Sequence, residues 1–244
     1  MPLQILYDDG PVLVINKPPG LLTQAPRGID SAEIKVREFY RQREEKPADA
    51  NLYVGIVHRL DRPVTGALTF TRHARAAKRL ATQFQERTVD KTYWALVEGL
   101  VEQEEGTWTD HLHKRHGMAQ SIVVAEDDPR GKMAILRYRV LARFDNASST
   151  GATWLQIALE TGRTHQIRVQ ASSRGHAVLG DHQYNAVTPF GPQTSEPRDR
   201  AIALHARELA FRHPMRDETV TVEAPLPDYW APFDLPVTTA DRRS

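Results

Sequence analysis

An aspartate set among arginines is the first feature of this 244-residue sequence that could do chemistry. It lies in the segment His58-Arg59-Leu60-Asp61-Arg62-Pro63-Val64-Thr65-Gly66, where a proline and a glycine predict a sharply shaped loop. Arg59 and Arg62 would favour the ionised carboxylate and lower its pKa. We therefore expect Asp61 to act as a charged nucleophile or electrostatic stabiliser. The segment alone leaves open a structural aspartate in a surface ion pair.

A second basic segment, residues 160–168 (ETGRTHQIR), joins a predicted strand to a predicted short helix. Gly162 turns the chain, and Thr164 is the expected N-cap of the helix. Arg163 and Arg168 could both point into a cleft at this turn. Solvated arginines at an ordinary strand–helix junction are the alternative.

A strand around Tyr93 carries the next candidate, because period-2 alternation places Tyr93, Ala95 and Val97 on one face. Tyr93 could stack on a base and use its hydroxyl group. A tyrosine that only packs in the core is the alternative.

The run His111-Leu112-His113-Lys114-Arg115-His116 partly matches the histidine cluster of a metal-dependent hydrolase. In that pattern Arg115 stands where an aspartate is needed, and cations among the ligands repel a metal. A basic loop is the preferred interpretation, and no metal site is expected.

The composition excludes several other classes of protein. The absence of cysteine excludes thiol nucleophiles, disulfide frameworks and cysteine-ligated zinc or iron–sulfur sites. Neither a glycine-rich phosphate loop, nor the dinucleotide fingerprint, nor Gly-x-Ser-x-Gly is present, which argues against NTPases, Rossmann oxidoreductases and α/β-hydrolases. No apolar run approaches the roughly 18 residues of a membrane span. The N-terminus lacks a signal-peptide pattern, so a cytoplasmic protein without membrane association is expected.

The basic residues are mostly arginine, with 25 Arg against 7 Lys, although the net charge is only +1. Arginine binds phosphate bidentately and stacks on bases, so a local RNA-binding groove is compatible with near neutrality. A codon bias toward arginine explains the same composition without any partner.

Paired strands outnumber helices, which predicts an α+β fold with a mixed, largely antiparallel sheet, flanking helices and a central cleft. A catalytic domain over residues 1–236 and a frayed tail over 237–244 are expected, with a monomer and no obligate protein partner as the default. Long loops or insertions are expected at 102–132 and 185–201. Predicted strands cover 5–7, 12–16, 67–71, 92–100, 133–144, 154–160, 203–211 and 219–223, and predicted helices cover 73–87 and 165–173.

Six segments, in order along the chain, resemble the RluA family of RNA pseudouridine synthases. The resemblance extends over about residues 3–232 and departs from the family pattern at Val64, Gln170 and Ala177, which affects the fine positioning of substrate. The chain also begins on the first hairpin, so the small N-terminal RNA-binding module of many relatives is not expected. The six segments are 14–20 (VINKPPG), 58–66 (HRLDRPVTG), 91–93 (KTY), 162–168 (GRTHQIR), 175–181 (GHAVLGD) and 204–206 (LHA).

The resemblance implies that the protein isomerises specific uridines of tRNA or rRNA to pseudouridine, without a cofactor. The residues His-Arg-Leu-Asp-Arg-Pro at the start of the 58–66 segment, together with the missing module, slightly favour tRNA as the substrate. A base stacked in RNA must first be flipped out, at a cost of a few kcal/mol. A catalytically inactive RNA-binding protein of the same fold is the alternative.

The resemblance also assigns roles to individual residues. Asp61 is implied as the catalytic carboxylate, with Arg168 as its partner. Tyr93 is implied to stack on uracil and to be the group near carbon 5 that removes the final proton. Ile167 is implied to pack on the other face of the base, and Arg59 to fill the gap left by the flipped nucleotide. The remaining substrate-contacting candidates are His58, Arg62, Thr65 and Arg163.

Overall fold

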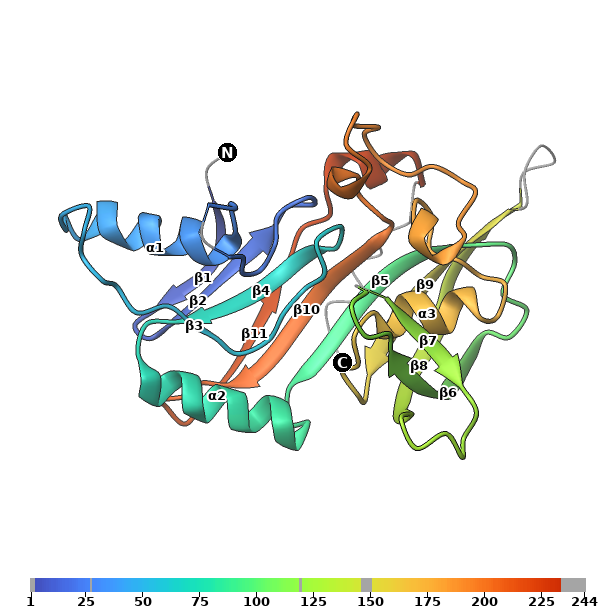
Figure 1. Ribbon diagram of the computed structural model, residues 1–244, viewed down its shortest axis with the longest axis horizontal. Coiled ribbons are helices and arrows are strands. Elements are labelled where there is room, and N and C mark those ends of the chain that lie inside the picture. Colours follow the sequence, from blue (N-terminus) through green and yellow to red (C-terminus); the bar gives the residue numbers. More distant parts are fainter. Residues whose placement is uncertain (1–2, 27, 119, 146–150, 234–244) are drawn as a thin grey trace.

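A computed structural model describes residues 3–26, 28–118, 120–145 and 151–233, and within them an eleven-stranded sheet forms the body of the protein (Figure 1). The main path of hydrogen-bonded strands is β1-β2-β4-β10-β5-β9-β8-β6-β7, with β11 beside β10 and β3 beside β4. The strands are β1 (Gln4–Asp9), β2 (Val12–Lys17), β3 (Gly55–Ile56), β4 (Thr65–Thr71), β5 (Asp90–Glu98), β6 (Glu105–Lys114), β7 (Ser121–Val124), β8 (Lys132–Phe144), β9 (Ala152–Leu159), β10 (Leu204–Arg212) and β11 (Thr219–Glu223).

The pairing of the strands confirms the predicted α+β class with a mixed, mostly antiparallel sheet. Within the described residues, β4 and β10 pair in parallel and the other strand pairs are antiparallel. The helices are α1 (Ala32–Arg43), α2 (Ala74–Glu86) and α3 (Gln166–Ser172), with 3-10 turns η1 (His182–Tyr184), η2 (Pro197–Asp199) and η3 (Asp228–Phe233).

Residues 102–132 were predicted to be an insertion or a long loop, and the loop alternative was wrong. This region holds β6 and β7, which extend the sheet beyond β8. Charged and histidine residues on β6 obscure its strand character, but Trp108 and Leu112 are buried, as alternation requires. The predicted tail at 237–244 lies outside the described residues.

Local sequence explains where the first two helices begin. The Ser31 hydroxyl accepts from the backbone N–H of Ile34 at the start of α1, and His73 Nδ1 accepts from Ala76 N–H at the start of α2. Both contacts satisfy a backbone donor that has no partner inside the helix. Within the described residues, no helix is long and apolar enough to cross a membrane.

The centre of the sheet is the most buried part of the molecule, and it determines where loops meet. Every residue of β4 is buried, and β4 lies beside β10, which in turn pairs with β5. Gly66 has φ +113°, and a Cβ atom there would lie 2.3 Å from the carbonyl oxygen of Ala206 on β10. Glycine therefore permits the close approach of the two strands at the end of the 58–66 loop.

Candidate active site

The 58–66 loop connects β3 to β4, and a lysine at the end of β2 forms a hydrogen bond to its backbone. The side chain of Lys17, at the end of β2, is fully buried, and its Nζ donates to the carbonyl oxygens of Pro18 (2.8 Å), Leu21 (2.8 Å) and Arg62 (3.1 Å). Burial, opposed by the charge of Asp61, lowers the pKa of Lys17 to about 7. Three acceptors match the three donors of an ammonium group, so the geometry suits the charged form.

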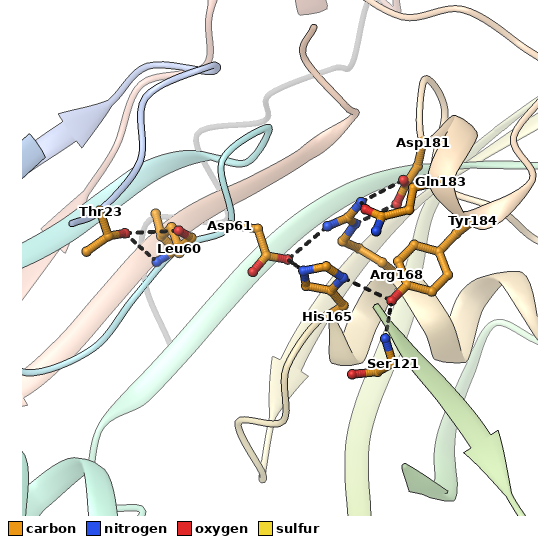
Figure 2. A network of polar contacts seen from close by, with 9 residues as sticks. All are labelled: Thr23, Leu60, Asp61, Ser121, His165, Arg168, Asp181, Gln183 and Tyr184. Atoms are coloured by element: carbon orange, nitrogen blue, oxygen red, sulfur yellow. Dashed lines mark hydrogen bonds and ion pairs between the residues drawn. The ribbon is translucent and has the colours of Figure 1, made fainter. Parts of the chain in front are cut away.

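Thr23 gives the loop a second attachment next to the aspartate. Its hydroxyl donates to the carbonyl of Leu60 (2.9 Å) and accepts from the Leu60 N–H (3.1 Å). One hydroxyl thus binds both the carbonyl and the N–H of Leu60, the residue immediately before Asp61 (Figure 2).

The arginines next to Asp61 in sequence do not pair with it. Arg62 donates to the carbonyl of Gly20 (2.8 Å) and to the carboxylate of Asp199 (2.6 Å). Arg59 is exposed at the rim of the cleft. Neither arginine forms an ion pair with Asp61, although both line the larger cavity beside it.

Asp61 instead meets Arg168, which α3 presents from the other side of the cleft. Arg168 Nη1 donates to Asp61 Oδ2 at 3.2 Å. The Arg168 side chain is 3% exposed and that of Asp61 is 25% exposed, so the pair joins a buried cation to a carboxylate that substrate can reach.

The guanidinium of Arg168 is fixed by a second carboxylate. Its Nε and Nη2 donate to the two oxygens of Asp181 at 2.6 and 2.8 Å, and Nη2 also donates to Gln183 Oε1 at 2.9 Å. Burial lowers the pKa of Arg168, but the hydrogen bonds and charge of Asp181, with Asp61, outweigh it and raise the pKa above its usual value. The bidentate pair leaves Nη1 to face Asp61.

His165 contributes a second contact to Asp61. Its Nε2 lies 3.6 Å from Asp61 Oδ2, and its Nδ1 lies 2.9 Å from the hydroxyl of Tyr184. It caps α3 with a left-handed backbone (φ +55°) and makes no side-chain cap, so the prediction of Thr164 as the N-cap was wrong. The Gln166 side chain instead accepts from Arg163 N–H and from the Thr161 hydroxyl, which fixes this turn.

Asp61 borders two cavities of different character. The smaller, about 110 Å³, is lined by Tyr93, Leu159, Ile167 and Leu204 together with parts of the two motifs. The larger, about 540 Å³, is lined by the arginines and polar groups of the cleft, including Arg59, Arg62, Arg168, His182, Gln183 and Arg200. The carboxylate therefore borders both cavities, and Arg59, His165 and Arg168 also line both of them.

Tyr93 and Ile167 come together in the smaller cavity, on β5 and α3 respectively. Burial, and then the charge of Asp61, raise the pKa of Tyr93. The phenol thus stays protonated at neutral pH, which favours stacking and hydrogen bonding over action as a phenolate base. Arg163 lines the same cavity and donates to the Met133 carbonyl at 2.9 Å.

His58 and Thr65, at the two ends of the loop, make contacts inside the protein. His58 Nε2 accepts from the Thr69 N–H (2.9 Å), and its ring stacks on Phe84 at 4.6 Å. Thr65 is buried, and its hydroxyl lies 2.7 Å from Nδ1 of His205. Neither residue is among those that line the two cavities at Asp61.

The histidines of the 111–116 segment are spread along an extended strand and the turn after it. His111 and His113 lie on β6. Among the described residues, no three histidine, aspartate or glutamate side chains gather in a group that could hold a metal ion.

Sequence reasoning missed several residues that build the site. Asp181 and Lys17 lie in segments that carried the family resemblance, but nothing in their spacing indicated that one fixes Arg168 and the other the loop. No feature of the sequence indicated that Thr23 contacts the loop. His165 and Tyr184 are 19 residues apart, and only the fold shows that they touch.

Comparison with known proteins identifies the class. The RNA pseudouridylate synthase family model matches residues 11–173, so the chain belongs to that family. The resemblance to the RluA family is confirmed, and the protein is an isomerase that acts on RNA.

Similar proteins cover nearly the whole chain. An uncharacterized RNA pseudouridine synthase of Synechocystis is 33% identical over 94% of this chain and 67% of its own length. The ribosomal large subunit pseudouridine synthase D of Pseudomonas aeruginosa is 36% identical over 93% of this chain and 69% of its own. The solved structure of human RNA pseudouridylate synthase domain containing 1 has the same fold, with TM-score 0.72 and 24% identity over 98% of this chain and 92% of that one.

Proposed function

We propose that Asp61 is the carboxylate that acts on the ribose of a flipped uridine. The observation that carries this proposal is its place between two cavities, with one oxygen held by the buried Arg168. A carboxylate that is paired with a buried arginine and open to substrate suits either attack on the anomeric carbon or removal of a ribose proton.

The two cavities suggest how the nucleotide is divided. The uracil ring fits the smaller one, between Tyr93 and Ile167, and the sugar and its phosphates lie toward the arginines of the larger one. The C1′–N1 bond breaks, the base turns over, and a C1′–C5 bond forms. The proton at carbon 5 is lost and N1 gains one, so no external electron source is needed.

The wider RNA contact is proposed to be electrostatic. Arg59, exposed at the rim, is placed to fill the gap left by the flipped nucleotide, while Arg62 and Arg163 stand beside the cavities for contacts with phosphate. Binding that depends on phosphate contacts weakens steeply with added salt.

Large-subunit rRNA is one candidate substrate, since several relatives carry that RNA in their names. Transfer RNA, which the sequence slightly favoured, is the other. We further propose that residues 1–236 form one catalytic domain that acts in the cytoplasm as a monomer, without a protein partner or cofactor.

The test is release of tritium from carbon 5 of uridine in unmodified tRNA and, separately, unmodified large-subunit rRNA. We expect the wild-type protein to release tritium from one of them, and Asp61→Asn to release none while its melting temperature is unchanged. Asp199→Asn, which changes a nearby carboxylate outside the Asp61 contacts, is the matched control and should keep substantial turnover. Residual turnover by Asp61→Asn would remove Asp61 from the chemistry, and binding without release by the wild type would favour the inactive RNA-binding alternative.

A further inference from the structure

Two nitrogen atoms approach the same oxygen of Asp61. Arg168 Nη1 lies 3.2 Å and His165 Nε2 lies 3.6 Å from Oδ2, and both residues sit at the start of α3 (Figure 2). The other oxygen, Oδ1, stands outside this pair of contacts. An arrangement that fixes one carboxylate oxygen leaves the other for the reaction.

A chain of hydrogen bonds determines which nitrogen of His165 carries the proton. The backbone N–H of Ser121, the first residue of β7, donates to the hydroxyl oxygen of Tyr184 at 2.8 Å. Because the hydroxyl oxygen already accepts from Ser121, we infer that its proton points to His165 Nδ1 at 2.9 Å and that Nδ1 is the acceptor. Nε2 therefore carries the hydrogen that faces Asp61. The opposite tautomer would bring a lone pair against the carboxylate.

The backbone at His165 is a second, independent observation. Its φ of +55° lies in the left-handed region, which is uncommon for residues other than glycine. Strained backbone of this kind persists where surrounding structure holds it and gathers at functional sites. Here it begins α3 and turns the imidazole toward the loop that carries Asp61.

We propose that His165 is a positioning residue that holds Asp61 through a neutral imidazole whose tautomer is set by Tyr184 and the backbone of β7. The proposal rests on the function proposed for Asp61. In this arrangement Arg168 supplies the charge, and His165 restricts the rotation of the carboxylate.

Burial, more than the charged groups around it, favours the neutral form of His165. Burial lowers its pKa first; Asp61 and Asp181 oppose this, while Arg168 and Lys114 add to it. Burial also raises the pKa of Tyr184, so the phenol stays a donor. Protonation of His165 would place a second cation against Oδ2 beside Arg168, and a carboxylate between two cations is a weaker nucleophile and base. Turnover should therefore decline on the acid side as His165 protonates.

The test uses two variants that retain the backbone and the packing. His165→Asn suits a left-handed position but is too short to reach Asp61, and Tyr184→Phe removes only the hydroxyl. His116→Asn and Tyr53→Phe, both at exposed positions, are the matched controls. Melting temperatures establish that each variant is folded.

We expect kcat for tritium release to fall roughly 10- to 100-fold in His165→Asn with KM little changed, since a small misplacement of a reacting group costs about that much. In Tyr184→Phe the acid limb of the kcat profile should move to higher pH, because the donor that favours neutral Nδ1 is gone. Unchanged kcat in His165→Asn, or an unmoved acid limb in Tyr184→Phe, would overturn the proposal.

Long-range ¹H–¹⁵N spectra of the histidine rings give a readout that does not depend on activity. The resonance assigned to His165, by its loss in His165→Asn, should show the Nε2–H tautomer in the wild type. An Nδ1–H tautomer would refute the proposed chain of hydrogen bonds from Ser121 through Tyr184 to His165. If the wild type released no tritium, the function proposed for Asp61 would fail, while this spectrum would still test the contact itself.

Discussion

The two sides of the cleft hold Asp61 by different means. On the side of β2 and the loop after it, Lys17 and Thr23 bind backbone groups of the 58–66 loop. On the side of α3, Arg168 and His165 approach the carboxylate itself, and Asp181 and Tyr184 hold them in turn. The first side fixes where the loop runs, and the second fixes the charge and orientation of the side chain.

This difference predicts that some substitutions at this site change mainly turnover, whereas others change mainly the free energy of unfolding. Contacts to backbone carbonyls serve the fold as much as the reaction, so their loss should appear mainly in the free energy of unfolding. Contacts to the carboxylate should appear mainly in turnover. Four changes test that division, one through turnover and three through the free energy of unfolding.

The largest effect is expected from Arg168→Lys on the α3 side. An ammonium is a point charge and cannot pair bidentately with Asp181 while also reaching Asp61, so kcat should fall roughly 100-fold. The melting temperature should change little, because a cation remains beside Asp181. Single-turnover tritium release measures the loss, with Arg137→Lys, whose side chain is largely exposed, as the control. A rate near that of the wild type would exclude Arg168 from the site.

Lys17→Met on the loop side should act mainly on stability. Methionine fills a similar volume but leaves three carbonyl oxygens without their donor, which should cost about 3 kcal/mol in the free energy of unfolding. Urea unfolding measures it. Lys35→Met removes a surface ion pair to Asp30 and should cost less than about 1 kcal/mol. Equal costs for the two variants would contradict the role given to Lys17.

Thr23→Val tests a second attachment of the loop through the free energy of unfolding. The substitution removes a hydroxyl while the side chain keeps nearly the same shape. We expect a loss of about 1–2 kcal/mol in the free energy of unfolding, because the N–H and carbonyl of Leu60 both lose their partner. Thr82→Val, on the exposed surface of α2, is the control and should be close to neutral. A neutral Thr23→Val would show that the loop does not need this attachment.

The last prediction concerns pH and His58, at the start of the loop. Burial, with a contribution from Lys91, lowers the pKa of His58 to about 3, and its Nε2 must stay unprotonated to accept from Thr69 N–H. The unfolded chain, with an ordinary histidine pKa of about 6.5, binds a proton in the window from about 6.5 down to 3 that the folded protein does not. The free energy of unfolding should therefore fall as the pH is lowered through that window.

The measurement is urea unfolding at several pH values in that window, for the wild type and His58→Gln. The decline should be shallower in the variant. Part of it should remain, because burial also lowers the pKa of His205, to about 4. Equal slopes in the two proteins would show that His58 does not carry the effect.

Much of the fold could be predicted because alternation and helical period are local properties. The first hairpin, β4, α2, β8 and the last two strands all fall close to their predicted positions. Prediction failed at β6 and β7, where polar residues on the exposed face obscured the strands, and at the start of α3. There His165 adopts a left-handed backbone, which no helix-capping rule for threonine indicates.

The residue types alone determined that this protein carries a carboxylate in a sharp loop, arginines to pair with it and a tyrosine on a strand, and their order along the chain gave the family. Only the tertiary structure decided which arginine meets Asp61. The neighbours Arg59 and Arg62 turn to the rim and to Asp199, while Arg168, 107 residues away, makes the contact. The reason is physical: side chains that follow one another in a loop diverge, whereas the order β4-β10-β5-β9 brings the end of the 58–66 loop and the start of α3 to the same cleft.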